Sequence, residues 1–513
     1  MPRTVSPPAA QDLFSLVGGV AAARGAHPAL AVEADGVVET WSYERLAAAA
    51  ARAAGRLAEH GVGRGDRVAL LAGSGAEFVV AFLAALASGA AVLPVNLAYR
   101  RREIAHLLVD AEPRLLIAAR DRIPAIGELD ASERRSLGEV LVAEELVGAA
   151  DGAGGALAPL LELARDDLAL LLYTSGTTGA SKGAVLSHGN LLSMIASLHE
   201  AWRWSADDVL DLTLPLFHLH GLVNGVCCAL AAGATLRIAP RCEAAAVVER
   251  LAAGEATLFF GVPTLYVRLV EELRRRGGAR FPRVRLFVSG SAPLAAETFA
   301  AFRVLAGQEI LERYGMSETG MLVGNPIDGP RLPGTVGTPL PGVEMRLVDA
   351  VGAPVAAGGE GEIEVRGPNV FSGYWRAPEK TAASFREDAE GRRWFRTGDR
   401  GRIDPATGHV TLLGRSSELI LSGGFNVYPR EVEEVLLRLP GVREAAVVGE
   451  PHAEFGQSPV AFLVVDRPLA IAELDAHCRA ELAPFKLPRR YLFRDALPRN
   501  ALGKVERRRL LTP

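Results

Sequence analysis

The feature that most constrains the fold is a stretch rich in glycine and hydroxyl side chains that follows a run of apolar residues. Residues 168–172 are Leu-Ala-Leu-Leu-Leu, and residues 173–183 are Tyr-Thr-Ser-Gly-Thr-Thr-Gly-Ala-Ser-Lys-Gly. The apolar run predicts a buried strand. Backbone N–H groups can close around phosphate oxygens only where side chains are absent. Three glycines, several hydroxyls and Lys182 at the end of a strand therefore predict a loop that binds a triphosphate.

A run of Gly, Ser and Thr is more often an ordinary surface turn, and a single such run would favour that interpretation. Here the preceding buried strand and Lys182 favour phosphate binding. The spacing is not that of the P-loop, because Lys182 lies three residues after Gly179 and is followed by Gly183. We therefore expect a different ATP-binding fold.

Length and composition predict a globular protein of several domains. The chain has 513 residues, which is more than one ordinary hydrophobic core holds, so we expect two or more domains. Hydrophobic residues make up 49% and charged residues 23% of the chain, as in folded α/β proteins and unlike disordered ones. The net charge of −4 does not predict a nucleic-acid partner.

Targeting and redox signals point to the cytoplasm. The cysteines, Cys227, Cys228, Cys242 and Cys478, have no metal-binding or disulfide spacing, so we expect a reducing compartment. The first residues have no apolar run behind their charge, so we expect no signal peptide. Residues 78–95 carry no charge, but Ser-Gly at 88–89 and a proline at 94 divide them into a helix and a short strand. We expect no transmembrane segment.

Alternating helical and strand patterns predict an α/β fold with parallel sheets. Helices are expected at residues 42–60 and 101–111, and strands at residues 67–72, 91–95, 114–118, 257–262 and 285–289. Residues 344–349 and 360–366 alternate polar and apolar side chains and predict a small β-rich subdomain. The composition changes after residue 415, before an amphipathic helix at residues 429–439. We expect a boundary near residue 416.

The loop at residues 173–183 resembles the signature loop of the adenylate-forming superfamily, which comprises acyl-CoA synthetases, peptide-synthetase adenylation domains and firefly luciferase. Other motifs of the superfamily follow in its order and cover essentially the whole chain. They are Val-Ser-Gly-Ser-Ala-Pro-Leu at 288–294, Arg-Tyr-Gly-Met-Ser-Glu-Thr at 313–319, Tyr-Trp-Arg at 374–376, Thr-Gly-Asp at 397–399, Gly-Arg at 414–415, Gly-Gly-Phe-Asn-Val-Tyr-Pro at 423–429 and Asn-Ala-Leu-Gly-Lys at 500–504.

The resemblance implies an α/β fold with two domains. Residues 1–415 would form a large N-terminal AMP-binding domain of two α/β subdomains plus a β-rich subdomain. Residues 416–513 would form a small, mobile α+β C-terminal domain that carries the catalytic lysine. The superfamily usually has lysine or aspartate at the hinge between the two, where this chain has Ser417. That departure puts the rate of domain rotation in question.

The resemblance also implies the ATP site. Tyr314 would stack on adenine, and Asp399 and Arg415 would contact the ribose hydroxyls. Glu318 would bind Mg²⁺ that bridges the phosphates. The full implied ATP-binding set is Thr174, Ser175, Gly176, Thr177, Thr178, Gly179, Lys182, Ser289, Gly290, Ser291, Tyr314, Gly315, Ser317, Asp399 and Arg415.

The catalytic residues implied by the resemblance are Lys504, Glu318 and His218. Lys504 would bridge the carboxylate and the α-phosphate during adenylation. After rotation of the C-terminal domain it would withdraw, and Gly423 and Gly424 would line the channel for CoA. Acetylation removes the charge of a lysine, so we expect a lysine acetyltransferase that acts on Lys504 to inhibit adenylation.

Within the superfamily the chain looks most like malonyl-CoA synthetases, through Pro-Leu-Phe-His-Leu-His-Gly at 215–221 and Gly-Pro-Asn-Val-Phe at 367–371. Arg313 comes directly before Tyr314, and a guanidinium there could pair with the second carboxylate of a dicarboxylic acid. The alternative is that Arg313 pairs with a protein acid such as Glu312. His218, His220 and Arg285 are the other acyl-site candidates.

We predict an ATP-dependent acid–CoA ligase that uses Mg²⁺ and activates malonate or methylmalonate. Residues 321–324, Met-Leu-Val-Gly, are more apolar than the corresponding segment of several malonate-specific relatives. A ligase for medium- or long-chain fatty acids is therefore an alternative. A stand-alone enzyme that loads a carrier protein is a further alternative. A non-catalytic acyl or nucleotide binder is disfavoured, because Lys182, Glu318, Asp399 and Lys504 are all present.

Overall fold

The computed structural model describes residues 10–34, 36–130, 133, 137–151, 161–174, 181–239, 243–422, 425–452, 455–500 and 503–511. The chain divides into two compact units. The first comprises Met1–Pro333, Gly337–Glu344 and Arg366–Arg393, and the second comprises Gly334–Val336, Met345–Val365 and Trp394–Pro513. The β-rich segment is therefore grouped with the C-terminal residues, and the boundary near residue 416 stays a prediction.

One sheet of the first unit has the strand order β18-β8-β7-β4-β3-β5-β6 among the described residues. Its strands are β3 (Arg67–Leu71), β4 (Ala91–Pro94), β5 (Leu115–Ala118), β6 (Glu139–Val142), β7 (Leu168–Thr174), β8 (Lys182–Ser187) and β18 (Gly373–Tyr374). The strands from β7 to β6 are parallel, as the alternating pattern predicts. β8 does not follow this parallel arrangement, because β7 and β8 form an antiparallel hairpin.

The other sheet of the first unit has the order β15-β14-β13-β12-β11-β9-β10-β1-β2 among the described residues. Its strands are β1 (Pro28–Ala34), β2 (Val37–Ser42), β9 (Val209–Leu212), β10 (Thr235–Ile238), β11 (Leu258–Gly261), β12 (Leu286–Ser289), β13 (Ile310–Met316), β14 (Gly320–Gly324) and β15 (Thr338–Pro339). β1, β10, β9, β11, β12 and β13 are parallel, and β14 returns antiparallel to β13.

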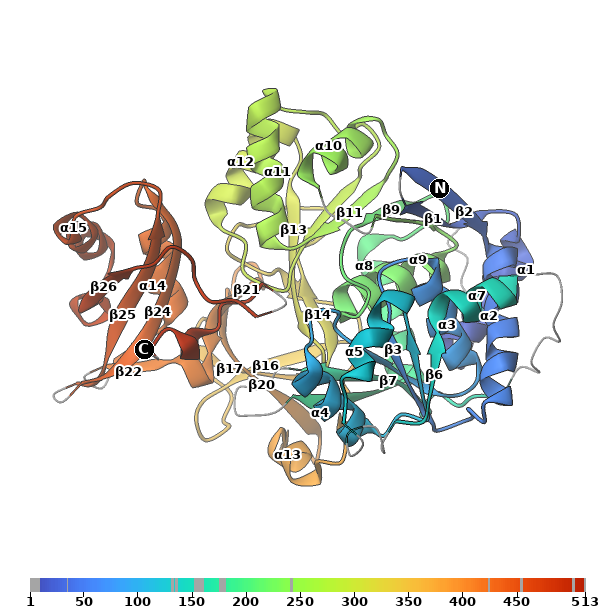
Figure 1. The fold of residues 1–513 in the computed structure, drawn as a ribbon. Helices are drawn as coiled ribbons and strands as arrows, with labels where there is room; N and C mark the ends of the chain where they lie inside the picture. Colours follow the sequence, from blue (N-terminus) through green and yellow to red (C-terminus); the bar gives the residue numbers. More distant parts are fainter. Residues whose placement is uncertain are drawn as a thin grey trace. The chain divides into compact units, whose positions relative to one another are not determined.

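Helices pack against both sheets. The helices of the first unit are α1 (Leu13–Arg24), α2 (Tyr43–Glu59), α3 (Ala76–Ala87), α4 (Arg101–Ala111), α5 (Ile123–Gly127), α7 (Ala143–Asp151), α8 (His188–Trp202), α9 (Cys228–Ala232), α10 (Ala244–Ala252), α11 (Pro263–Arg276), α12 (Ala296–Ala306) and α13 (Pro378–Ala383), with the 3-10 turn η1 (Arg120–Arg122) and the π-helix η2 (His220–Cys227). The short strand β19 (Phe385–Glu387) also falls within its residues. Figure 1 shows α10, α11 and α12 side by side next to β11 and β13.

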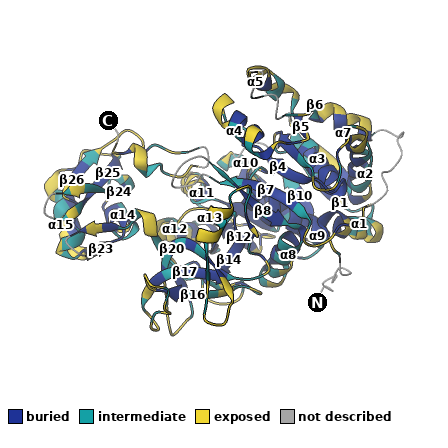
Figure 2. Cartoon of the chain, turned by 90° about the horizontal axis from the view of Figure 1, so that it is seen from below, coloured by how far each residue is buried: buried dark blue, intermediate teal, exposed yellow. Residues whose placement is uncertain are grey.

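Local sequence signals explain where several helices begin and end. The Ser42 hydroxyl accepts a hydrogen bond from the Arg45 N–H and caps α2. Every residue of α3 except Glu77 is buried, and Gly89 follows the helix with a φ of 73°, a left-handed conformation that favours glycine. Figure 2 shows this helix in the colour of buried residues. The segment at 78–95 is thus a core helix and a strand, and in the described part of the chain no helix is long and apolar enough to cross a membrane.

The second unit contains two sheets and two helices among its described residues. The first sheet joins β16 (Glu344–Val348), β17 (Glu360–Arg366), β20 (Arg393–Ile403) and β21 (Val410–Arg415), and the 3-10 turn η3 (Ser416–Glu418) follows. The second joins β22 (Ile420–Ser422), β23 (Phe425–Val427), β24 (Val442–His452), β25 (Gly456–Val465) and β26 (Arg490–Phe493). The helices are α14 (Pro429–Leu437) and α15 (Ile471–Glu481), and the remaining short turns are η4 (Pro484–Lys486) and η5 (Arg507–Arg509).

Candidate active site

β7 and β8 flank the residues of the expected phosphate loop in the sequence. Thr174, the last residue of β7, pairs directly with Lys182, the first residue of β8. Ser175, Gly176, Thr177, Thr178 and Gly179 lie between them and fall outside the described residues. The Lys182 ammonium lies 5.2 Å from the centre of the Tyr374 ring. Burial and the charge of Lys380 lower the pKa of Lys182. The hairpin thus holds Lys182 directly opposite Thr174.

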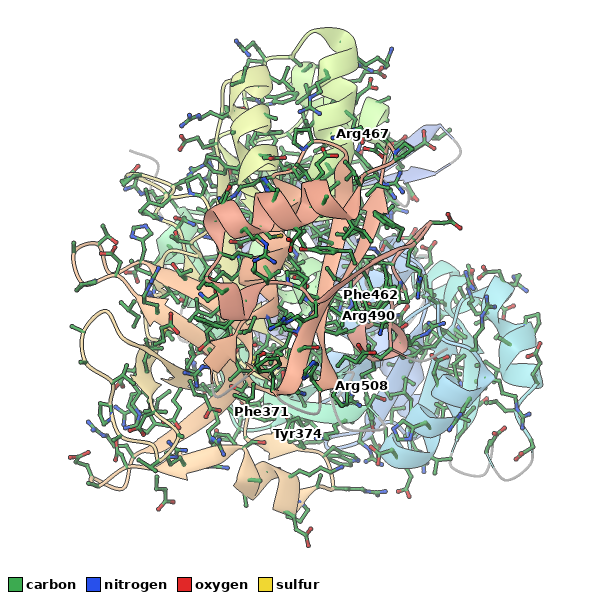
Figure 3. The ribbon with its side chains drawn as sticks, turned by 90° about the vertical axis from the view of Figure 1, so that its left-hand side faces the viewer. Phe371, Tyr374, Phe462, Arg467, Arg490 and Arg508 are labelled. Atoms are coloured by element: carbon green, nitrogen blue, oxygen red, sulfur yellow. The ribbon has the colours of Figure 1, made fainter. Side chains whose placement is uncertain are left out.

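Glu318 lies in the turn between β13 and β14, where three separate segments meet. Its Oε1 accepts hydrogen bonds from the Tyr374 hydroxyl at 3.0 Å and from the Thr174 hydroxyl at 3.5 Å. Its backbone carbonyl accepts the N–H of Phe371 at 2.8 Å. Figure 3 shows Phe371 and Tyr374 close together, and their rings are 4.9 Å apart. The Glu318 carboxylate is therefore buried, and it lies beside Thr174, the last residue of β7 before the expected phosphate loop.

The chemistry of this carboxylate fits Mg²⁺. Magnesium is usually bound through one or two carboxylates together with substrate phosphates and water, rather than by a cage of protein ligands. Glu318 supplies one such carboxylate, and the described residues contain no group of three or more His, Cys, Asp or Glu that could hold a metal ion. The two hydroxyls on Oε1 orient the carboxylate without neutralising it. Tyr374 was not among the site residues predicted from the sequence. Its hydrogen bond, which orients the Glu318 carboxylate, was therefore missed.

Arg313 on β13 is a buried cation without a partner among the described residues. Its side chain is 4% exposed, and neither Nε nor Nη2 has a hydrogen-bond partner there. Burial lowers the pKa of Arg313 to about 9, so the guanidinium is charged at neutral pH. Glu312, the acid considered as its partner, points to the other side of the strand and accepts the N–H of Leu294 at 3.3 Å.

His220 opens the π-helix η2 and lies near this guanidinium. Its ring stacks on Phe260, with ring centres 6.0 Å apart, and its Nδ1 is 3.4 Å from the Ser291 hydroxyl. Burial, followed by the charges of Arg313 and His218, lowers the pKa of His220 far below its usual value. The imidazole is therefore neutral. Of the acyl-site candidates, Arg313 and His218 both act electrostatically on His220, so His220 lies near each of them.

Arg285, the remaining acyl-site candidate, is engaged elsewhere. Its Nε and Nη2 donate to the two carboxylate oxygens of Asp208 at 2.8 Å and 2.7 Å, and its Nη1 donates to the carbonyl of Trp202 at 2.8 Å. A guanidinium that is paired this fully has little capacity left for a substrate carboxylate. These contacts disfavour the predicted role of Arg285 at the acyl site, and we leave this residue out of the proposed site.

The expected nucleotide loop follows β12, and its backbone is unusual. Ser291 has a φ of 73°, a conformation that side-chain-bearing residues rarely adopt. The buried Ser289 hydroxyl has no hydrogen-bond partner among the described residues. Tyr314 is buried on β13, and at Gly315 a Cβ atom would lie 2.2 Å from the carbonyl oxygen of Gly320. The β13–β14 hairpin that carries Tyr314, Ser317 and Glu318 therefore requires glycine at this position.

The second unit holds the expected ribose and catalytic residues. Asp399 on β20 pairs across the sheet with Arg415 on β21, and Arg415 Nε lies 2.8 Å from Asp399 Oδ1. Lys504 lies in an exposed turn, where its N–H donates to the Asn500 side chain at 3.0 Å and its carbonyl accepts the Asn500 N–H at 2.9 Å. Gly423 and Gly424, the expected CoA-channel residues, fall in a gap of the described chain.

Arg507 holds the segment that carries Lys504. Its Nη2 donates to Glu433 Oε2 of α14 at 3.1 Å, and its Nε donates to Glu418 Oε2 of η3 at 3.2 Å. In the sequence, the arginines at 507–509 resemble an ordinary solvated cluster. Arg507 contacts residues that are distant in the sequence, so no local pattern predicts these hydrogen bonds. The lysine segment is therefore attached to the turn that contains Ser417.

Comparison with known proteins agrees with these features. Residues 20–375 match the AMP-binding enzyme family, and residues 431–504 match the AMP-binding enzyme C-terminal domain. A mitochondrial malonate–CoA ligase from Bos taurus is 35% identical over 87% of this chain and 81% of its own length. An oxalate–CoA ligase from Arabidopsis thaliana is 34% identical over 91% of this chain and 92% of its own length.

A solved structure, ATP-bound MatB from Rhodopseudomonas palustris, is 40% identical over 98% of both chains, with a TM-score of 0.89. The predicted fold class and the predicted enzyme class, an AMP-forming acid–CoA ligase, are both confirmed. The chain belongs to the AMP-binding enzyme family.

Proposed function

We propose that this ligase activates malonate, as malonyl adenylate, and transfers it to CoA. The observation that carries the proposal is Arg313, a buried guanidinium that has no acid partner among the described residues. A buried cation left unpaired costs several kcal/mol, and a carboxylate that pairs with it recovers much of that cost. A substrate with a second carboxylate supplies that partner.

The relatives support a dicarboxylic acid. Those named for their substrate include several malonate–CoA ligases and one oxalate–CoA ligase, and both malonate and oxalate carry two carboxylates. Methylmalonate presents the same two groups with one added methyl, and it is our alternative substrate. Neutral His220 adds an uncharged polar group near the guanidinium, and His218 lies close to both.

In the first half-reaction a malonate carboxylate oxygen would attack the α-phosphorus of ATP, and pyrophosphate would leave in line. Tyr314 would stack on adenine, and Asp399 with Arg415 would hold the ribose. Lys182 and the loop at residues 174–179 would bind the phosphates. Mg²⁺ bound through Glu318 would supply charge neutralisation at the phosphates. Lys504 would place its ammonium between the attacking carboxylate and the α-phosphate.

In the second half-reaction the CoA thiol would attack the carbonyl carbon of the adenylate and release AMP. We propose that Lys504 withdraws by rotation of the C-terminal residues and that Gly423 and Gly424 then face the pantetheine arm. The chain would rotate near Ser417. A cytoplasmic location and inhibition by acetylation of Lys504 belong to the same proposal.

One observation favours a second candidate, a ligase for medium-chain fatty acids. Met321, Leu322 and Val323 are all buried on β14, the strand paired with the one that carries Arg313. An apolar wall of this kind suits an alkyl chain. Under this alternative Arg313 would stay unpaired when the substrate binds, which is the less favourable arrangement.

The test is pyrophosphate release with Mg·ATP and CoA across malonate, methylmalonate, acetate, octanoate and benzoate, with thioester products identified by mass. A preference for malonate or methylmalonate that is lost in Arg313→Ala supports the proposal. A preference for octanoate or benzoate that survives in the variant rejects the dicarboxylate site and leaves the ligase class intact. If the thioester forms only with a carrier-protein phosphopantetheine, then that group, and not CoA, is the acceptor.

A further inference from the structure

The Arg313 guanidinium lies directly against Gly290, the residue that follows β12. A Cβ atom built on Gly290 would lie 2.3 Å from Cζ, 2.4 Å from Nε and 2.6 Å from Nη1 of Arg313. Separations below 3.0 Å are not found between real atoms of this kind, so an alanine at 290 and the present position of the guanidinium exclude each other. The absence of a side chain at 290 is what gives the guanidinium its place.

A second glycine faces the same side chain from the neighbouring strand. Gly324 on β14 is the direct cross-strand partner of Arg313. A Cβ atom at Gly324 would lie 3.9 Å from Arg313 Cβ and 3.9 Å from Trp202 Nε1, with Leu340 Cδ2 nearest at 3.3 Å. A methyl group at 324 would require Leu340 to shift by a few tenths of an ångström and would leave Arg313 in place, whereas a methyl group at 290 would displace the charged end of Arg313.

We propose that Gly290 is a specificity-determining residue, because it seats the Arg313 guanidinium at the position from which it binds the distal carboxylate of the substrate. The inference rests on the proposed function, since it concerns the same acyl site. Gly290 is also one of the residues expected in the nucleotide loop, so its effect on the acid must be separated from any effect on ATP.

The backbone at 290 permits this test. Gly290 is not among the glycines with positive φ, so an alanine fits its backbone conformation without strain. The atoms in its way belong to the far end of a flexible side chain and not to the backbone. An alanine at 290 should therefore leave the fold in place and move the guanidinium. The expected loss is in recognition of the second carboxylate and not in folding.

The experiment compares wild type, Gly290→Ala, Arg313→Met and the double variant, with Gly324→Ala as the matched control. Each is assayed for kcat and KM with malonate, with propionate and with ATP, and for its thermal unfolding midpoint. We expect Gly290→Ala to raise the KM for malonate at least about tenfold, because a charged hydrogen-bonded pair is lost or lengthened. In Gly290→Ala the rise in the KM for malonate should exceed any change in the KM for ATP and in kcat/KM for propionate, and Gly324→Ala should change the KM for malonate far less than Gly290→Ala does.

The double variant decides whether Gly290 acts through Arg313. If it does, the double variant has the malonate KM of Arg313→Met alone, because neighbouring residues that act on one group are not additive. Additive effects, or a rise in the KM for ATP as large as that for malonate, would overturn the inference and leave the proposed function standing. An Arg313→Met enzyme with unchanged malonate kinetics would overturn both.

Discussion

Replacing Arg313 with methionine should change catalysis and stability in opposite directions. Methionine keeps much of the length of the side chain and removes its charge. Removing one partner of a buried, hydrogen-bonded charge pair typically costs about 2–5 kcal/mol, which corresponds to a fall in kcat/KM for malonate of roughly 30-fold to several thousand-fold. Propionate, which carries a methyl in place of the second carboxylate, should lose nothing and should become the better substrate of the variant.

The ligand-free enzyme should respond with the opposite sign. Arg313 is 4% exposed, and burial lowers its pKa to about 9, so the wild-type enzyme holds a charge that is poorly solvated until substrate binds. Replacing a buried charge by an apolar side chain of similar size can stabilise a protein by about 1–4 kcal/mol. The thermal unfolding midpoint of ligand-free Arg313→Met should therefore rise, and malonate should no longer raise it further.

These two measurements use the same purified variant, with a pyrophosphate-release assay and a thermal melt. A variant that keeps its malonate preference would refute the argument that the guanidinium reads the second carboxylate. A ligand-free variant that unfolds well below wild type would show that Arg313 has a protein partner, and the same reasoning would fail.

Three further outcomes are expected. Lys504→Ala, or acetylated Lys504, should lose adenylate formation while CoA still cleaves supplied adenylate, and equal loss of both half-reactions would contradict its role. Glu318→Gln should lower kcat about 100-fold and raise the Mg²⁺ concentration needed, whereas the control Tyr374→Phe should lose far less; an unchanged Mg²⁺ requirement would exclude Glu318 as the ligand. Burial lowers the pKa of His220, so below about pH 6.5 the unfolded chain binds a proton at this residue that the folded chain does not. As the pH falls through this range, the unfolding midpoint of His220→Gln should therefore fall less than that of wild type, and superimposable plots of midpoint against pH would argue against this.

Local signals predicted the helices well. The helix expected at residues 42–60 is α2 (Tyr43–Glu59), and the helix expected at 101–111 has those same bounds. In α2 the apolar spacing selects the buried face, and the Ser42 cap fixes the start. These features lie within a few residues of the helix, so the sequence alone reveals them.

Features that depend on distant residues were not predictable. The apolar run at 168–172 predicts β7, but its antiparallel pairing with β8 depends on which strand lies beside it in the sheet. The π-helix η2 (His220–Cys227) lies in an apolar stretch, where no periodicity separates it from an α-helix. The contact of Arg507 with Glu433 and the engagement of Arg285 with Asp208 join residues 74 and 77 positions apart.

The candidate site divides in the same way. The motifs named Glu318, Tyr314, Asp399 and Arg415 without the elements that carry them, and in the structure Asp399 on β20 lies opposite Arg415 on β21. The sequence could not tell that Arg313 lacks a partner, since Glu312 is its nearest acid along the chain and only the strand geometry sends the two side chains to opposite faces. Nor could it reveal that Gly290 makes room for the guanidinium, which requires the positions of two strands at once.

The most direct test of the account is to supply malonate labelled with ¹⁸O in its carboxylates, together with Mg·ATP and CoA, and to measure the mass of the AMP released. Malonyl-CoA and AMP that carries one ¹⁸O atom are expected, because a malonate oxygen attacks the α-phosphorus and leaves with AMP when the CoA thiol attacks. Unlabelled AMP, formation of ADP and phosphate, or no turnover of malonate beside rapid turnover of a monocarboxylic acid would contradict it.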